Sequence, residues 1–164
     1  MDFATSADLA LWAALLLTAV AIVRVHRRTN AVAARLPELG LPVGAKAPGL
    51  DRLDVAPDGP TLLLFLSSGC GGCPAVLEEA LALAAGGRAV PMRLVFSGDP
   101  LPMNGAAGLI PIRTGERALL DDYRVPGTPF AVLVEAGRVR RAEPVRSMRV
   151  LGDLAGVTPP PGAA

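Results

Sequence analysis

Two cysteines three positions apart constrain this chain more than any other feature of its sequence. They lie in the segment SSGCGGCP (67–74), between the apolar run 61–66 and a run of helix-forming composition, 75–85. If the chain after Cys70 is helical, the sulfur atoms of Cys70 and Cys73 both lie at the first turn, within reach of each other. The first turn of a helix has free backbone N–H groups and the positive end of the helix dipole, and both stabilise a thiolate. Because the thiolate is the attacking species in disulfide exchange, the pattern predicts a redox-active thiol pair.

A zinc site and a structural disulfide are the alternatives for this pair. A structural zinc ion usually has four ligands, and the only histidine of the chain, His26, lies far upstream of the cysteines. A disulfide that closes so short a loop restricts the unfolded chain little and therefore adds little stability. We favour redox chemistry, and we expect neither a metal site nor a cofactor.

The composition fits one domain with appendages. The chain has 164 residues, of which 51% are hydrophobic, and its net charge is +1. So small a charge gives no reason to expect a nucleic-acid partner.

An uncharged run near the N terminus predicts a membrane anchor. Residues 9–23 carry no charged side chain, and as a helix they cover about 22 Å of a bilayer core of about 30 Å. A cleavable signal peptide needs a basic region before the apolar run, whereas only Asp2 and Asp8 carry charge there. A core helix would show polar residues at helical spacing, and this run is apolar all round. We predict a single-pass anchor in the cell membrane that contacts lipid through residues 9–23.

The chain divides into four predicted parts. Residues 1–28 form the N-terminal membrane anchor with its basic flank, and residues 29–45 form a tether rich in proline and glycine. Residues 46–157 form the folded domain, and residues 158–164 form a disordered tail.

The folded domain is predicted to be α/β, with a central mixed sheet and helices on both of its faces. Residues 61–66 are a short apolar run bounded by turn residues, which is typical of a buried strand. A helix through residue 85 follows the cysteines, with Pro74 in its first turn and Gly86 at its end. Residues 90–96 form a second strand, and the β-α-β connection makes the two strands parallel. Four further elements are predicted: a short edge strand at 50–55, a helix from Thr114 (a candidate N-cap) to about Asp122, an antiparallel hairpin of strands 130–134 and 138–142, and a helix at 148–155.

Two separated motifs together resemble the thioredoxin superfamily. One is the Cys70–Cys73 pair after an apolar strand, and the other is Gly127-Thr128-Pro129 directly before the predicted hairpin. The resemblance implies a thioredoxin-like fold for the folded domain. Within the superfamily the chain resembles the membrane-anchored, TlpA-like disulfide reductases, and most closely the methylamine-utilisation thioredoxin-like proteins. These also carry an N-terminal span followed by a basic segment.

The resemblance implies roles for four residues. Cys70 would be the exposed nucleophile and Cys73 the resolving thiol. Pro129 would be a cis-proline, and the backbone of Thr128 would pair with an incoming peptide. An ordinary trans proline at the start of a strand is the alternative. The implied partners are protein thiols and disulfides, with a membrane-bound or soluble thiol as electron donor.

Three positions depart from the pattern of thioredoxins. The tryptophan before the first cysteine is Gly69 here, the buried aspartate six residues before that cysteine is Leu64, and the Gly-Pro pair between the cysteines is Gly71-Gly72. Without the carboxylate, the sequence identifies no proton acceptor for Cys73. The direction of the reaction (reductase, oxidase or isomerase-like) therefore stays open.

The predicted function is that of a membrane-tethered thiol–disulfide oxidoreductase. One alternative is a thiol peroxidase of the same superfamily, whose usual threonine before the reactive cysteine is absent. Another is a non-enzymatic copper-carrying module, which usually has a wider cysteine spacing and a distal histidine.

The face of the membrane on which the domain lies is contested by two arguments. Four arginines follow the apolar run and none precedes it, so the positive-inside rule places the domain in the cytoplasm: Arg24, Arg27, Arg28 and Arg35. The resemblance implies the opposite face, where disulfides form and persist. Since a cytoplasmic reductase would have little need of an anchor, we predict the extracytoplasmic face.

Overall fold

The structure, a computed structural model, describes residues 39–55, 58–103 and 108–157. The predicted membrane anchor, most of the predicted tether and the predicted tail lie outside these residues. Among the helices that are described, none combines the length and the apolar character needed to cross a bilayer.

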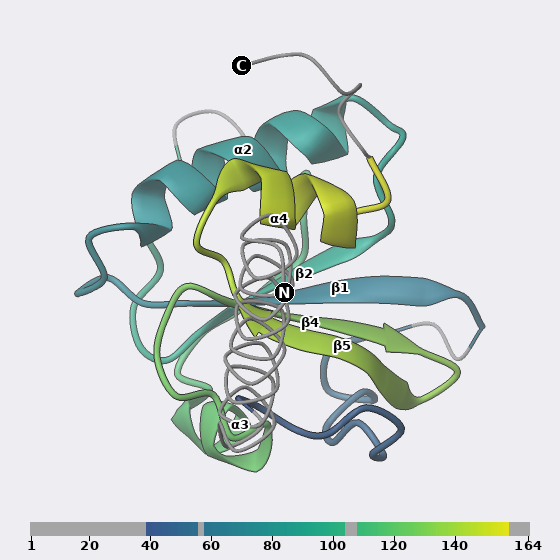
Figure 1. The fold of residues 1–164 in the computed structure, drawn as a ribbon. Coiled ribbons are helices and arrows are strands. Elements are labelled where there is room, and N and C mark those ends of the chain that lie inside the picture. The colour runs from purple at the N-terminus through teal and green to yellow at the C-terminus, as the bar shows by residue number, and fades with distance from the viewer. Residues whose placement is uncertain (1–38, 56–57, 104–107, 158–164) are drawn as a thin grey trace, which may run out of the picture. The chain divides into compact units, whose positions relative to one another are not determined.

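A five-stranded mixed sheet organises the described residues (Figure 1). Its order is β3-β2-β1-β4-β5, with parallel pairing of β1 to β2 and of β2 to β3 and antiparallel pairing of β4 to both β1 and β5. The strands are β1 (Pro60–Leu66), β2 (Met92–Phe96), β3 (Ile112–Arg113), β4 (Phe130–Glu135) and β5 (Arg138–Pro144). The β-α-β unit, the hairpin and the mixed sheet predicted from the sequence are confirmed.

Helices cover both faces of this sheet, as predicted. Helices α2 (Cys73–Ala85) and α4 (Met148–Leu154) pack on one face, and α3 (Arg117–Asp122) packs on the other (Figure 1). The central strand β1 is therefore enclosed on both sides, and every residue from Leu62 to Leu66 is fully buried. This enclosure explains why β1 is a continuous apolar run and shows no alternation of polar and apolar residues.

Helix α2 carries the first half of the functional site. Its buried residues, Cys73, Val76, Leu77 and Ala80, recur at the spacing of one helical face. The helix begins where Pro74 needs no N–H partner, and it ends at Gly86, followed by Gly87 with a φ of +66°. The first turn of α2 is thus held against the sheet through Cys73.

Two local predictions are wrong. Residues 50–55 form consecutive turns and no strand, because their backbone bonds are local: the N–H of Leu53 donates to Gly49 and that of Val55 donates to Leu50. Thr114 does not cap α3, which begins at Arg117 after Glu116 and has no side-chain cap.

The folded unit also begins earlier than the predicted boundary at residue 46. Gly40 is buried against Phe130, and the N–H of Gly44 donates to the carbonyl of Val139 at 2.8 Å. Residues 39–45, predicted as tether, therefore line β5 and cover the sheet.

Candidate functional site

The Cys70–Cys73 pair lies between the end of β1 and the first turn of α2. The two cysteines form a disulfide, with their Cα atoms 5.4 Å apart. Two successive turns bring them there: the N–H of Cys70 donates to the carbonyl of Ser67 at 3.3 Å, and the N–H of Cys73 donates to that of Cys70 at 3.2 Å. The site predicted from the sequence is thus assembled at the N terminus of a helix.

The two sulfur-bearing side chains differ in exposure. Cys73 has no exposed surface and belongs to the apolar core between the sheet and α2. Cys70 is partly exposed and packs at the edge of the same core. Cys70 is therefore accessible in part from the surface, whereas Cys73 is not.

The segment before β4 lies directly against this disulfide. The Thr128–Pro129 peptide bond is cis, and the carbonyl oxygen of Thr128 lies 3.2 Å from the sulfur of Cys70. In the disulfide this sulfur carries no hydrogen, whereas the reduced thiol would be able to donate to the carbonyl. The structure thus brings together all four residues singled out in the sequence, across 58 positions from Cys70 to Thr128.

Gly72 faces Pro129 beside the disulfide without crowding it. A Cβ atom built on Gly72 would lie 3.8 Å from Cδ of Pro129, an ordinary van der Waals distance. A Cβ atom on Gly69 or Gly71 would meet nothing within 4 Å. The glycines around the cysteines therefore leave the disulfide open to a partner.

Ser67 is a residue of the site that the sequence prediction missed. Its hydroxyl oxygen lies 2.8 Å from that of Thr128, in a hydrogen bond whose donor either residue can supply. The bond ties the end of β1 to the segment before β4. The signal in the sequence is slight, since Ser67 stands out only as the first polar residue after the buried run.

The end of β5 also supports the site. The N–H of Val145 donates to the carbonyl of Pro129 at 3.0 Å, and this bond continues the β4–β5 ladder past the pair of Phe130 with Pro144. Pro129 is consequently held at the end of β5 through Val145.

The two segments that meet at the disulfide carry no charged side chain. Segments 67–75 and 125–129 contain no Asp, Glu, Lys, Arg or His, and no charged side chain is buried within the described residues. Stabilisation of a Cys70 thiolate therefore comes from the N terminus of the thirteen-residue helix α2. The apolar core disfavours the thiolate of Cys73, and Leu64 contributes to that core.

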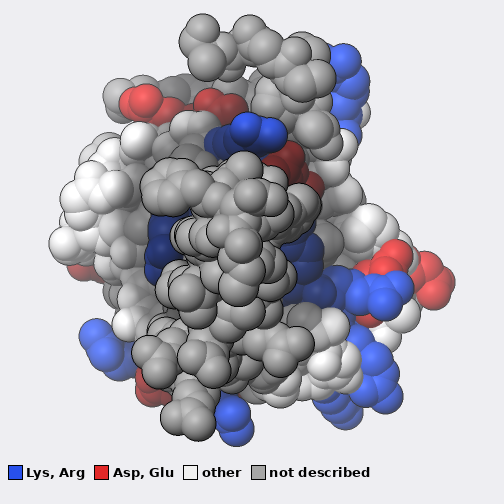
Figure 2. Space-filling view, in the orientation of Figure 1, with Lys and Arg blue, Asp and Glu red and all other residues white. Residues whose placement is uncertain are grey.

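Charges on the surrounding surface are mixed. Figure 2 shows Lys and Arg interspersed with Asp and Glu over the described part of the surface in view. The described residues contain no group of three or more His, Cys, Asp or Glu side chains placed to hold a metal ion.

A groove of about 420 Å³ borders α2 near the disulfide. It runs between the helix and the chain that follows β2, and all but one of its lining side chains are apolar. The lining residues are Pro74, Leu77, Glu78, Leu81, Leu101, Pro102 and Met103.

Comparison with known proteins finds likeness in structure only. No protein-family model and no curated protein matches the sequence. Among solved structures the chain is similar to a thiol:disulfide interchange protein from Bacteroides sp., with a TM-score of 0.49, 15% identity, and coverage of 73% of this chain and 90% of that one. It is similar to the exposed lipoprotein thioredoxin Etrx1 from Streptococcus pneumoniae, with a TM-score of 0.49, 18% identity, and coverage of 70% and 97%. It is also similar to the thioredoxin domain of the thiol-disulfide oxidoreductase BVU-2223 from Bacteroides vulgatus, with a TM-score of 0.44, 17% identity, and coverage of 70% and 99%.

Proposed function

We propose that this chain is a thiol–disulfide oxidoreductase that exchanges disulfides with protein substrates through Cys70 and Cys73. The observation that carries the proposal is the pair itself. A disulfide lies at the N terminus of α2, with one sulfur-bearing side chain accessible and the other sealed in the core. A purely structural bridge has no need of that asymmetry, whereas an exchange reaction requires one sulfur to meet the substrate and the other to be kept from it.

The reaction transfers two electrons and passes through one covalent intermediate. In the reducing direction, the Cys70 thiolate attacks one sulfur of a substrate disulfide, which forms a Cys70–substrate disulfide and releases the first substrate thiolate. Cys73 then loses its proton to solvent or to the released substrate thiolate, and attacks the sulfur of Cys70. This step releases the second substrate thiolate and forms the Cys70–Cys73 disulfide. An external dithiol restores the reduced pair by the same two steps, and the reverse sequence inserts a disulfide into a substrate.

The residues around the pair have separate roles in this scheme. The N-terminal end of α2 stabilises negative charge on Cys70 as attacking and as leaving thiolate. The carbonyl of Thr128 accepts the S–H of reduced Cys70 and offers the substrate backbone a hydrogen-bond acceptor beside the reacting sulfur. Pro129, which has no N–H, presents no competing donor there.

Trapping of the intermediate tests the proposal. In the Cys73→Ala variant the mixed disulfide has no internal thiol to resolve it, so reducible adducts with other proteins should accumulate on Cys70 in cells. The Cys70→Ala variant, which keeps only the buried thiol, is the matched control and should form few adducts. Absence of adducts in Cys73→Ala, or equal amounts in both variants, would contradict the exchange mechanism. Rapid consumption of hydrogen peroxide by the wild type would favour a thiol peroxidase instead.

We further propose that the domain is tethered to the cell membrane by residues 9–23 and faces away from the cytoplasm. The support is the uncharged run itself and the resemblance to anchored disulfide reductases. A membrane-impermeant thiol reagent, applied to intact cells after mild reduction, should label Cys70. Labelling only after lysis would place the domain in the cytoplasm, as the arginines after the run predict.

A further inference from the structure

The β4–β5 ladder determines which residue stands across from Thr128. Phe130 is paired with Pro144, and the bond from the N–H of Val145 to the carbonyl of Pro129 extends the same register by one residue. One further step places Arg146 opposite Thr128. Neighbouring strands lie about 4.8 Å apart, and the carbonyl of Thr128 is itself 3.2 Å from the sulfur of Cys70. The backbone of Arg146 is thus separated from the sulfur of Cys70 by one strand spacing and the distance from the Thr128 carbonyl to that sulfur.

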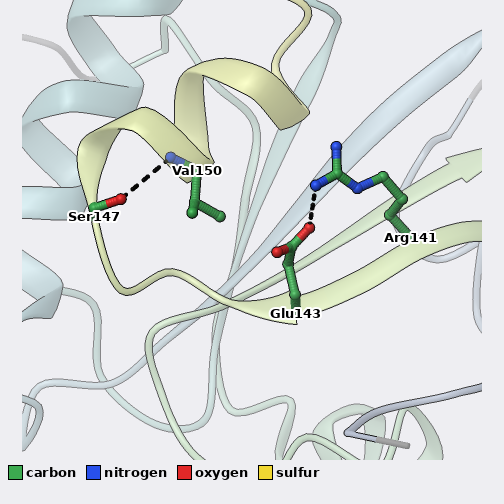
Figure 3. A network of polar contacts seen from close by, with 4 residues as sticks. All are labelled: Arg141, Glu143, Ser147 and Val150. Carbon is green, nitrogen blue, oxygen red and sulfur yellow. Dashed lines mark hydrogen bonds and ion pairs between the residues drawn. The ribbon is translucent and has the colours of Figure 1, made fainter. Parts of the chain in front are cut away.

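Arg146, like Arg149, forms no ion pair or side-chain hydrogen bond within the described residues, whereas the other three arginines of segment 138–149 each have a partner. Segment 138–149 contains five arginines and a single acidic residue. Arg140 contacts the carboxylate of Glu135, Arg141 contacts that of Glu143 (Figure 3), and a guanidinium nitrogen of Arg138 donates to the carbonyl of Gly44.

The backbone around Arg146 is held in place while its side chain stays exposed. On one side, Val145 is buried and bonded to Pro129. On the other, the hydroxyl oxygen of Ser147 accepts the N–H of Val150 and caps α4 (Figure 3). Arg146 therefore presents a long cationic side chain from a fixed position at the end of the sheet that carries the disulfide.

A single fixed charge has influence here because the segments that touch the disulfide contain no charge of their own. Glu143, the acidic residue of the same strand, is already bound by Arg141. Glu143 is the only carboxylate of β5. A substrate peptide that lies against Thr128 consequently has the Arg146 cation beside it and no unpaired carboxylate of β5. At a distance of about 8 Å in partly solvated surroundings, attraction between unit charges changes an encounter equilibrium by roughly three- to tenfold.

We propose that Arg146 is a specificity-determining residue that selects substrate proteins with an acidic side chain next to the reactive cysteine. The inference rests on the proposed function, because it concerns the step in which Cys70 meets its substrate. It assigns to the site a preference in charge that neither the cysteine pair nor the Thr128–Pro129 segment provides. Since the guanidinium is exposed, the preference should be lost at high salt, where the Debye length is about 3 Å at 1 M.

Peptides with one activated cysteine test this preference. Each peptide carries its cysteine as a mixed disulfide with 2-thiopyridine, and a Glu, Gln or Lys is placed next to that cysteine. Cys70 attacks the peptide sulfur, forms a Cys70–peptide disulfide and releases the thiopyridine, whose absorbance gives the second-order rate constant. Cys73 then displaces the peptide thiolate. The protein is the full chain in detergent, reduced beforehand.

We expect the Glu peptide to react about three- to tenfold faster than the Gln peptide and the Lys peptide to react slower than both, at low salt. Arg146→Glu should reverse this order, while Arg146→Lys should keep it. Arg88→Glu is the matched control: Arg88 is exposed and follows the C-terminal end of α2, thirteen residues of helix away from the cysteines. It should behave as the wild type.

The outcomes separate this inference from the proposed function. If none of the peptides reacts with the wild type, the exchange function itself fails. If the Gln peptide reacts but all three peptides have equal rate constants, the exchange function stands and the role of Arg146 is refuted. The role is equally refuted if Arg88→Glu reverses the order as Arg146→Glu does, because the effect would then be one of net charge.

Discussion

Tyr123 is the residue whose removal should alter the pH dependence of stability most clearly. Its side chain is fully buried at the end of α3 and packs on Phe65 of β1, with ring centroids 5.2 Å apart. Its hydroxyl group donates to the carbonyl of Pro48 at 2.9 Å. Burial raises the pKa of Tyr123 well above its ordinary value, and the neighbouring charge of Asp122 raises the pKa further. The substitution Tyr123→Phe keeps the ring and removes only the hydroxyl group.

The magnitude follows from these contacts. At neutral pH the variant loses one hydrogen bond and leaves the Pro48 carbonyl without its donor, so its free energy of unfolding should fall by about 1 to 2 kcal/mol. Above the pKa of an unfolded tyrosine, about 10, the unfolded wild type releases its proton and the folded wild type keeps it. Stability that the neutral hydroxyl contributes is therefore lost as pH rises, at about 1.4 kcal/mol per pH unit. The wild type and Tyr123→Phe should become equally stable about one pH unit above 10.

Denaturant unfolding of both proteins, at intervals from neutral to strongly alkaline pH and with the disulfide intact, measures this convergence. Tyr123 is the only tyrosine of the chain, so the near-ultraviolet absorbance of tyrosinate reports this residue alone. In the folded protein tyrosinate should appear only at a pH well above that of the unfolded protein. Tyrosinate formation at the ordinary pKa in the folded state, or a stability difference that does not change with pH, would refute the reasoning.

Two further predictions concern the packing that positions the site. Gly40 and Gly44 both have a φ of +87°, but a Cβ atom on Gly40 would lie 2.8 Å from Cζ of Phe130, whereas one on Gly44 would meet nothing within 4 Å. Gly40→Ala should therefore lower the melting temperature clearly more than Gly44→Ala, which carries only the backbone cost of about 1 kcal/mol; equal losses would show that Phe130 yields freely. Ser67→Ala removes the hydrogen bond to Thr128, and because that bond is only partly buried we expect a loss of about 1 kcal/mol or less in denaturant unfolding. A much larger loss would mean that the bond holds the segment before β4 in place by itself.

Local features of the sequence were sufficient to predict most of the elements around the site. The apolar run of β1, Pro74 at the start of α2 and Gly86 at its end act over a few residues, and so does the turn of the β4–β5 hairpin. Where local signals conflict, prediction failed. Residues 50–55 mix apolar and charged residues without a strict alternation, and in the fold they form their own turns, with Leu53 buried.

The sequence by itself was sufficient to predict the cysteine pair, since two cysteines at this spacing before a helix lie within reach of each other. Which residues surround that pair was decided by the tertiary structure, through strand pairings between distant segments. The β4–β5 ladder shows the reason most plainly. At the hairpin turn Glu135 is paired with Arg138 and Val134 with Val139, but an irregularity between Leu133 and Val134 shifts the register, so that Leu133 is paired with Arg141. Counting from the turn would place Glu143 opposite Phe130. The extra residue in β5 places Pro144 there instead, because a single bulge moves every later pair by one position.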